Sequence, residues 1–354
     1  MLSPLNPQPL VSILIPCYNA EPWLAETIAS AIAQTWQNKE IIVVDDGSTD
    51  GSLAIAKGFQ SEIVKVISQA NWGASAARNS AFQVSRGAFI QYLDADDLLA
   101  PDKIERQISR FSLDLLDPSQ APPDYVVTCE WARFYQTPDE ALFIPQPLWQ
   151  DLLPVDWLIC AWQGNWMMHP AAWLVPRHIA KSAGDWNEQL SLDDDGEYFS
   201  RVVLASQAIA FCQGAKTYYR SGMAGSLSKA KSPTALKSAF SSIELRTSCL
   251  LAKETSDRTR HACARLYQYF VAGVYPEALD LVGQAEQRVK QLGGSPWRPK
   301  EGLLFELFAS AIGWRSARWL RHFLQKYGWG KLPMGWKFYL FLQQWNYKNK
   351  NLTN

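Results

Sequence analysis

Short apolar runs alternate with helical patterns along the first hundred residues. Four runs have the length and the β-branched composition of strands, and they occupy residues 11–16, 40–46, 63–69 and 88–94. Apolar residues recur at helical spacing over residues 23–32, and residues 73–84 form a second short helix candidate. Strand, helix, strand in this order predicts parallel pairing with right-handed crossovers. We therefore expect an α/β sheet covered by helices, with its ligand beyond the carboxyl ends of the strands.

The rest of the chain has a loop, one more strand and then helices. Prolines predict a loop over residues 114–124, and a strand pattern resumes over residues 125–136. Long helical patterns occupy residues 233–292 and end at a Gly-Gly-Ser-Pro sequence. We place the end of the catalytic domain near residue 230, with a helical extension over 231–296 and a tail over 297–354.

Composition excludes several classes of protein. Of the 354 residues, 47% are apolar and 19% are charged, which is typical of a folded chain and not of a disordered one. Lys plus Arg and Asp plus Glu both number 34, which disfavours a nucleic-acid partner. The six cysteines are scattered, so we expect reduced thiols and neither zinc nor disulfides. The chain shows no spanning apolar run and no secretory signal, and the expected location is cytoplasmic.

Polar residues follow three of the four predicted strands. The first strand runs into Pro-Cys-Tyr-Asn (16–19), the second into Asp-Asp-Gly-Ser-Thr-Asp (45–50) and the fourth into Asp-Ala-Asp-Asp (94–97). Carboxylates crowded at one edge of a sheet repel each other unless a cation lies among them. Mg²⁺ or Mn²⁺ bridging a substrate diphosphate suits such oxygen ligands. Alternatively, the same residues are ordinary turn and helix-capping sequences.

These motifs, taken together, resemble those of the nucleotide-sugar glycosyltransferases of family 2. The resemblance is carried by VSILIPCYNAEPWLAETIASAIAQTW, VVDDGSTDGS, GASAARNSAF, YLDADD with PDKI, and GDWNEQLSLDDDGEYFSRV, and it covers residues 11 to about 228. It implies the GT-A fold, a mixed sheet flanked by helices and followed here by a helical C-terminal region. The donor half would occupy about residues 1–110 and the acceptor half about residues 111–230.

The resemblance implies a set of donor-binding residues. They are Pro16, Tyr18, Asn19, Asp46, Ser48, Gly73, Arg78 and Asp94. The first three would line the pocket for the base and the ribose. Asp46 would accept the imide N–H of a uracil or thymine ring, which suits a carboxylate because it only accepts hydrogen bonds. Arg78 would lie near the nucleotide or diphosphate, unless it is a surface salt-bridge partner on its helix.

The family's Asp-x-Asp element falls on Asp94 and Asp96. Asp96 would be the direct ligand of the metal, with Asp94 nearer the ribose. A third acidic cluster precedes Arg201, and the resemblance implies that its Asp195 is the general base, with Asp194 as the alternative. Attack from the face opposite the diphosphate would invert the anomeric carbon. Without the resemblance, the same acids are a favourable first turn of a helix.

Three further residues are weaker candidates for the acceptor side. They are Trp166, His169 and Arg220. A single histidine is more often structural, and a tryptophan also fills ordinary cores. Tyr219 and Arg220, with Ser226 and Ser228, resemble a segment that closes over the diphosphate. Relatives often carry a histidine where this chain has Gly222, which puts that contact in doubt.

The tail has the opposite charge from the rest of the chain. Residues 297–354 contain ten Lys or Arg against two acids, a net charge of +8. Residues 314–327 place basic side chains on one side of a helix and aromatic and aliphatic ones on the other. This pattern fits an element at the surface of an anionic membrane. It fits equally well a helix whose apolar side packs on the catalytic domain.

We therefore expect an inverting transferase that depends on Mg²⁺ or Mn²⁺. It would move a sugar from a nucleoside-diphosphate donor, with UDP-sugars favoured, to a hydroxyl of a glycan or lipid-linked acceptor. The tail would make the protein peripheral at the cytoplasmic face of a membrane. Two rival functions stay open: a metal-dependent nucleotidyl or phosphoryl transferase, and a non-catalytic scaffold with the same fold.

Overall fold

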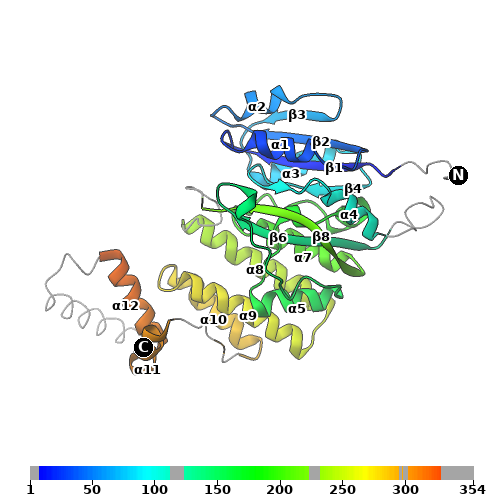
Figure 1. Cartoon of the computed structure of the whole chain (residues 1–354). Coiled ribbons are helices and arrows are strands. Elements are labelled where there is room, and N and C mark those ends of the chain that lie inside the picture. The colour runs from blue at the N-terminus through cyan, green and yellow to red at the C-terminus, as the bar shows by residue number, and fades with distance from the viewer. Residues whose placement is uncertain (1–7, 112–122, 223–231, 295–296, 298–301, 328–354) are drawn as a thin grey trace.

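The computed structural model describes residues 8–111, 123–222, 232–294, 297 and 302–327 (Figure 1). Its strands are β1 Val11–Cys17, β2 Lys39–Asp46, β3 Val64–Gln69, β4 Phe89–Tyr92, β5 Leu98–Leu99, β6 Tyr125–Phe134, β7 Val175–Pro176 and β8 Ala208–Arg220. Its α-helices are α1 Leu24–Ile32, α2 Ser52–Gly58, α3 Ala74–Val84, α4 Lys103–Arg110, α5 Pro154–Gly164, α6 Arg177–Ala183, α7 Asp194–Ala205, α8 Pro233–Lys253, α9 Asp257–Val274, α10 Leu279–Gln291, α11 Leu303–Ile312 and α12 Trp314–Tyr327.

The first sheet has the strand order β3-β2-β1-β4-β7. Strands β1 to β4 are parallel and β7 is antiparallel to β4, so the expected mixed sheet is confirmed. Figure 1 shows its four parallel strands in blue and cyan. All four predicted strands and both predicted helices are present. Because the parallel strands end at one edge, the polar motifs after β1, β2 and β4 lie at that edge.

A second sheet, β5-β8-β6, brings a distant strand to this edge. The short strand β5 follows the Asp-x-Asp loop directly and pairs with β8, with Leu98 opposite Tyr218 and Leu99 opposite Thr217. The sequence analysis did not predict β8. Its pairing with β5 places Arg220, at the end of β8, beside the loop of residues 94–97.

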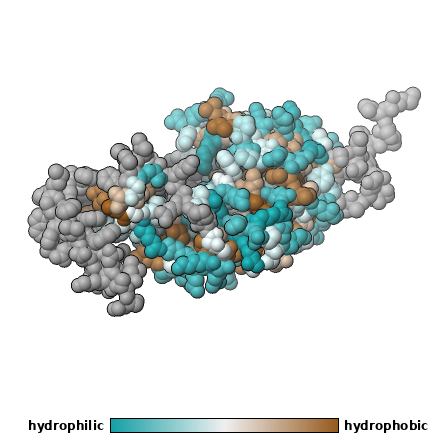
Figure 2. All heavy atoms as spheres, turned by 90° about the horizontal axis from the view of Figure 1, so that it is seen from below, coloured by the Kyte–Doolittle hydropathy of each residue, from teal (hydrophilic) through white to brown (hydrophobic). Residues whose placement is uncertain are grey.

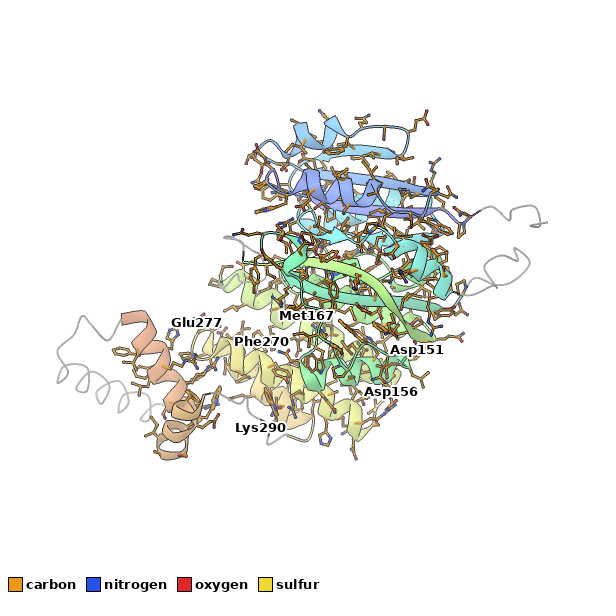
Figure 3. All side chains as sticks on the ribbon, in the orientation of Figure 1. Asp151, Asp156, Met167, Phe270, Glu277 and Lys290 are labelled. Atoms are coloured by element: carbon orange, nitrogen blue, oxygen red, sulfur yellow. The ribbon has the colours of Figure 1, made fainter. Side chains whose placement is uncertain are left out.

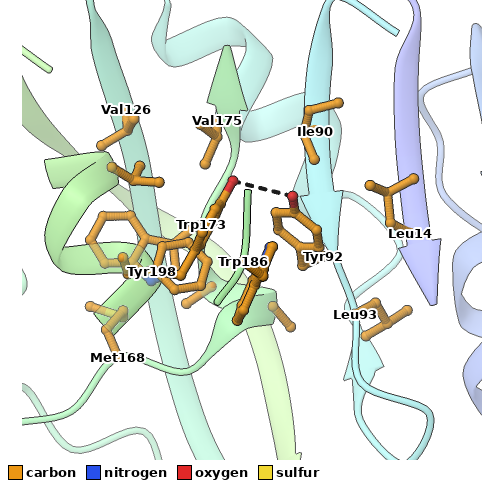
Figure 4. Close-up of a cluster of buried hydrophobic side chains, with 14 of the residues drawn as sticks. Leu14, Ile90, Tyr92, Leu93, Val126, Met168, Trp173, Val175, Trp186 and Tyr198 are labelled. Atoms are coloured by element: carbon orange, nitrogen blue, oxygen red, sulfur yellow. Dashed lines mark hydrogen bonds between the residues drawn. The ribbon is translucent and has the colours of Figure 1, made fainter. Parts of the chain in front are cut away.

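A cluster of buried aromatic rings joins the first sheet to α7 (Figure 4). Trp186 stacks on Tyr198 at 4.1 Å between ring centroids, and Trp173 stacks on Phe199 at 5.0 Å. The hydroxyls of Tyr92 and Tyr198 lie 3.2 Å apart. Trp173 is therefore a core residue. The cluster fixes the start of α7 relative to the end of β4, where the acidic loops emerge.

The helical extension supports an acidic loop of the catalytic domain. Ser238 on α8 accepts a hydrogen bond from the amide of Ser191 at 2.8 Å. One turn later, Ser242 donates to Oδ2 of Asp193 at 2.7 Å, and Arg246 pairs with the same oxygen at 2.6 Å. Asp193 has a left-handed backbone, with φ 62°, just before α7. Contacts from α8 thus hold the loop that presents Asp194 and Asp195, which sequence patterns did not predict.

Helix α12 coincides with the predicted amphipathic helix, and two of its basic residues make contacts that neither alternative included. Arg315 pairs with Glu286 of α10, and Arg318 donates to the carbonyl of Ala272 in α9. Part of the basic side therefore faces the helical extension. The two alternatives from the sequence were an apolar side packed on the catalytic domain and a helix that lies at a membrane surface. The tail residues beyond 327 lie outside the described part of the chain.

The described surface gives no sign of a membrane span. Among the described residues, no helix combines the length and the apolar character that crossing a bilayer requires. Figure 2, which views the molecule from below, shows hydrophilic and hydrophobic residues interspersed over the described surface on that side.

Candidate active site

Asp46, at the end of β2, organises the turn into α3. Its Oδ1 accepts from Nε2 of Gln69 at 2.8 Å and from the amide of Trp72 at 3.0 Å, while Oδ2 accepts from the amide of Gly73 at 2.8 Å. Gly73 has φ 96° and ψ 164°, a conformation that essentially only glycine adopts. The carboxylate is buried, and Oδ2 keeps one lone pair for a further donor.

The neighbouring Asp45 is a candidate that the sequence analysis missed. Its side chain is 1% exposed, and its buried Oδ1 has no hydrogen-bond partner. Its Oδ2 accepts a long hydrogen bond of 3.4 Å from the hydroxyl of Ser68. Successive side chains of a strand point to opposite faces of the sheet, so Asp45 and Asp46 cannot both bind the same group of a ligand. An unpaired buried acceptor is costly and marks Asp45 as a second partner for a donor group.

The motifs after β1 and β2 are hydrogen-bonded to each other. The amide of Asn19 donates to the hydroxyl of Ser48 at 3.0 Å, and Oδ1 of Asn19 accepts from the amide of Thr49 at 2.8 Å. Tyr18 is 50% exposed beside them. Pro16, which we expected to line the nucleotide pocket, is buried inside β1. Its side chain is covered, so its contribution is to the strand.

Arg78 on α3 connects two acidic clusters that are far apart in the sequence. Its Nη2 pairs with Oδ1 of Asp94 and its Nη1 with Oδ2 of Asp194, each at 2.8 Å. Its guanidinium lies 4.3 Å from the ring centroid of Trp186 and is buried. Burial alone lowers the pKa of Arg78, but the two carboxylates outweigh it and raise the pKa. The expected alternative of a surface salt bridge is wrong, because both pairs are internal.

The loop of residues 94–97 contains an uncompensated carboxylate. Asp96 is half-buried, and burial, reinforced by Asp97 and Asp94, raises the pKa of its carboxyl group to about 8. No group of three or more His, Cys, Asp or Glu in the described residues is arranged to hold a metal. Mg²⁺, however, is commonly held by one or two carboxylates together with substrate phosphates. Asp96 and Asp94 fit that pattern, because a cation would offset the charge that burial disfavours.

His169 lies behind this loop and not on the acceptor side. It is 1% exposed, its Nδ1 lies 3.0 Å from Oδ2 of Asp97, and its Nε2 lies 2.7 Å from the hydroxyl of Thr217. Burial lowers the pKa of His169 to about 3, so the ring is neutral. Our expectation that it faces the acceptor is wrong. Its buried contact with Asp97 supports the Asp-x-Asp loop instead.

Arg220 also belongs to the Asp-x-Asp loop. Its Nε donates to the carbonyl of Asp96 at 2.8 Å, its amide donates to Asp97 at 2.9 Å, and its Nη2 pairs with Glu26 at 2.5 Å. The residue is 5% exposed, so its expected place on the acceptor side is wrong. Ser226 and Ser228, of the segment expected to close over the diphosphate, lie outside the described residues.

Asp195 is better placed than Asp194 to accept a proton. Asp194 is engaged by Arg78 and by the hydroxyl of Ser75 at 3.2 Å. Within the described residues, the side chain of Asp195 accepts a hydrogen bond from the amide of the next residue, Gly196, at 2.8 Å and forms no ion pair. Burial, then the charges of Asp194 and Asp193, raise the pKa of Asp195 to about 7. It lines a cavity of about 280 Å³ together with Trp166, which is 41% exposed.

Comparisons with known proteins identify the family of this chain. The model for glycosyl transferase family 2 matches residues 12–145. An uncharacterized glycosyltransferase of Rickettsia prowazekii is 30% identical over 228 residues, which are 59% of this chain and 67% of that protein. The chain belongs to glycosyl transferase family 2. The family model includes Asp46, Arg78 and Asp96, whereas Asp195 lies beyond its matched region.

Other family relatives match over shorter stretches. An uncharacterized glycosyltransferase of Haemophilus influenzae is 41% identical over 104 residues, 28% of this chain and 42% of that protein. The chain thus spans less than half the length of this curated relative. A crystal structure of S. aureus TarS with UDP-GlcNAc has a TM-score of 0.66 at 16% identity, covering 88% of this chain and 91% of that one. This likeness confirms the expected GT-A fold.

Proposed function

We propose that this protein is an inverting, metal-dependent glycosyltransferase that uses a nucleoside-diphosphate sugar. The observation that carries the proposal is the double ion pair of Arg78, which joins Asp94 of the Asp-x-Asp loop to Asp194 beside Asp195. A candidate metal-binding loop and a candidate base are thereby held at one edge of the sheet. Transfer of a sugar from a diphosphate needs both a metal-binding loop and a base in one site. The fold alone does not require them to lie together.

The donor would lie across the ends of β1, β2 and β4. Asp46, with one remaining lone pair, or Asp45, with an unpaired oxygen, accepts the imide N–H of a pyrimidine base. The exposed ring of Tyr18 would cover that base, because Tyr18 directly precedes Asn19, whose amide is hydrogen-bonded to Ser48. UDP is the favoured nucleotide because this recognition needs an imide donor. The solved complex of TarS with UDP-GlcNAc supports the same choice.

The chemical step is a displacement at the anomeric carbon. Asp195 takes the proton of the acceptor hydroxyl while that oxygen forms a bond to the anomeric carbon. The bond from this carbon to the diphosphate oxygen breaks, and the electron pair leaves with the nucleoside diphosphate. Asp96 and Asp94 would hold a divalent cation, which would supply electrostatic stabilisation of the leaving diphosphate. Attack from the opposite face inverts the configuration. The acceptor is a hydroxyl of a glycan or a lipid-linked saccharide.

Nucleotide binding and product analysis test this proposal. Titration calorimetry with UDP should show binding that strengthens with Mn²⁺ and weakens with chelator. The Asp96→Asn variant should lose the Mn²⁺-dependent part, about 10-fold or more in Kd. Asp280→Asn, an exposed carboxylate at the start of α10, is the matched control and should behave as the wild type.

The products separate the rival functions. UDP-glucose and UDP-N-acetylglucosamine, incubated with the wild type and Mn²⁺, should release UDP. Release of UMP or of inorganic phosphate would instead indicate a nucleotidyl or phosphoryl transferase. UDP binding without any release would indicate a scaffold. The variants Asp45→Asn and Asp46→Asn identify the residue that recognises the base. Substitution of that residue should weaken the binding of UDP but not the Mn²⁺-dependent binding of pyrophosphate, which has no base.

We also propose that residues 297–354 contact an anionic membrane surface. Their net charge of +8 and their many aromatic residues support this proposal. Arg315 and Arg318 are used in contacts with the helical extension. The remaining basic residues of the tail would therefore supply most of the attraction to lipid headgroups.

A further inference from the structure

A cavity of about 280 Å³ lies next to Asp195, where the catalytic domain meets the helical extension. Helices α5, α7, α8 and α9 contribute its walls. Met167 follows α5 and Phe270 belongs to α9, and Figure 3 labels the two residues near each other. Its apolar lining is dominated by large rings and thioethers, among them Trp157, Trp162, Trp166, Met167, Met168 and Phe270. Its volume is close to the lower end for small-molecule sites, about 300 Å³.

The mouth of the cavity is formed where α5 ends and the chain turns into Trp166. Helix α5 ends at Asn165, which has φ 53° and ψ 40°, and the amide of Trp166 then donates to the carbonyl of Ala161 at 2.9 Å. The indole of Trp166 folds back over Gly164, where an added Cβ would lie 2.1 Å from its Nε1. Glycine at position 164 is therefore required for this position of the ring. Trp166 is 41% exposed and Met167 is 37% exposed, so both face solvent at the opening.

Neutral polar side chains complete the lining of the cavity. They are Asn165, Ser200 and Tyr269. A ligand with several hydroxyl groups matches such side chains, whereas an alkyl chain does not. The lining thus combines aromatic faces with neutral polar groups.

The charges in the lining favour a ligand without charge. Asp193 and Arg246 form an ion pair at 2.6 Å and offset each other. Asp195 then leaves the lining with an excess of negative charge when it is ionised. A carboxylate or phosphate on the ligand would be repelled at this short range. A neutral pyranose ring has apolar C–H faces for the aromatic walls and hydroxyl groups for the neutral polar side chains.

We infer that this cavity is a subsite for an uncharged pyranose ring of a saccharide acceptor, with Trp166 packed on the ring and the reacting hydroxyl directed to Asp195. The inference rests on the proposed glycosyltransferase function. It assigns half of the acceptor site to the helical extension, through α8 and α9. It also favours a saccharide over the lipid part of an acceptor at this position.

Saturation-transfer NMR on the full-length protein tests the subsite without any need for turnover. The probes are neutral methyl glycosides of glucose, galactose, mannose and the two N-acetylhexosamines, with methyl glucuronide and 1-hexanol as comparisons. At least one neutral glycoside should show saturation of its ring protons. Methyl glucuronide should bind at least about fivefold more weakly, because Asp195 repels its carboxylate.

Variants at the mouth connect any binding to the cavity. Trp166→Ala, which removes the ring, and Gly164→Ala, which displaces it, should each raise the Kd of the bound glycoside about tenfold. Leu142→Ala is the matched control, because Leu142 is 77% exposed and is not part of the cavity lining. All three variants should retain the wild-type affinity for UDP, which shows that the chain is folded.

Each contrary result has a defined meaning. Wild-type UDP binding and release with no saturation of any neutral glycoside would overturn the subsite and leave the proposed function intact. Saturation that is unchanged in Trp166→Ala and Gly164→Ala would place the sugar elsewhere and overturn it too. Strong saturation of 1-hexanol alone would assign the cavity to a lipid chain. Failure of UDP binding itself would remove the proposed function on which the inference depends.

Discussion

The Asp195 side chain is predicted to control the pH dependence of transfer. Its pKa, raised to about 7 by burial and by the neighbouring Asp194 and Asp193, lies well above the usual range of an aspartate. Only the ionised carboxylate can take a proton from the acceptor, so activity should be present above about pH 7 and lost as the pH falls. At pH 6, about one carboxylate in eleven is ionised, which predicts about a tenfold loss in kcat/KM.

Substitution of Asp195 by Asn removes the base altogether. The kcat of Asp195→Asn should fall by about 10² to 10⁴, because a positioned general base contributes that much, and the residual rate should lose the acid limb. The assay is the initial rate of UDP release from a UDP-sugar between pH 5.5 and pH 9 with saturating Mn²⁺. Hydrolysis by water suffices as a readout, since water needs the same base.

The matched variant is Asp194→Asn, which keeps an oxygen facing Arg78 and Ser75 but removes one charge. Because the charge of Asp194 raises the pKa of Asp195, this variant should retain activity, and its acid limb should shift to lower pH. Loss of activity in Asp194→Asn, together with an unaltered acid limb in Asp195→Asn, would refute the assignment of the base. A wild-type pH profile with no loss of activity near pH 7 would refute the prediction that burial raises the pKa of Asp195.

Two further predictions concern the nucleotide loop and the tail. Gly73→Ala should destabilise the fold by about 1–3 kcal/mol, measured by urea unfolding, because position 73 has φ 96° although a Cβ there would meet open space. The variant should also weaken UDP binding, because the amide of Gly73 is a hydrogen-bond donor to Asp46. Wild-type stability in this variant would contradict the prediction that a non-glycine residue is strained at this position. Removal of residues 297–354 should release the protein from anionic vesicles in a co-sedimentation assay, with neutral vesicles as the control. Unchanged sedimentation of the shortened chain would disprove the membrane proposal.

Patterns along the chain were sufficient for the donor half of the fold. The runs 11–16 and 40–46 alternate with helical spacing, and parallel strands with short crossovers must end at one edge of the sheet. The acidic and polar motifs after these strands therefore had to lie together. The later strand β8 escaped prediction, because its partners β5 and β6 are distant in sequence and pairing with them defines it.

Residue types and spacing also identified the acidic motifs, but not what each carboxylate does. Asp45 and Asp46 are equivalent in the sequence, and only the packed structure shows that the amides of residues 72 and 73 engage Asp46. His169 and Arg220 were assigned to the acceptor side, yet burial places both behind the Asp-x-Asp loop. Burial and charge contacts depend on all the elements that surround a side chain, so local patterns do not reveal them.

The sequence by itself determined an α/β sheet, the family and the chemical character of three acidic loops, because strand and turn preferences act over a few neighbouring residues. Tertiary structure alone decided that Arg78 joins two of those loops, at Asp94 and Asp194, and that α8, through Arg246, supports the second of these two. Each of these contacts connects residues from separate elements. Their partners are selected by the packing of helices on the sheets, which fixes distances that no local spacing encodes.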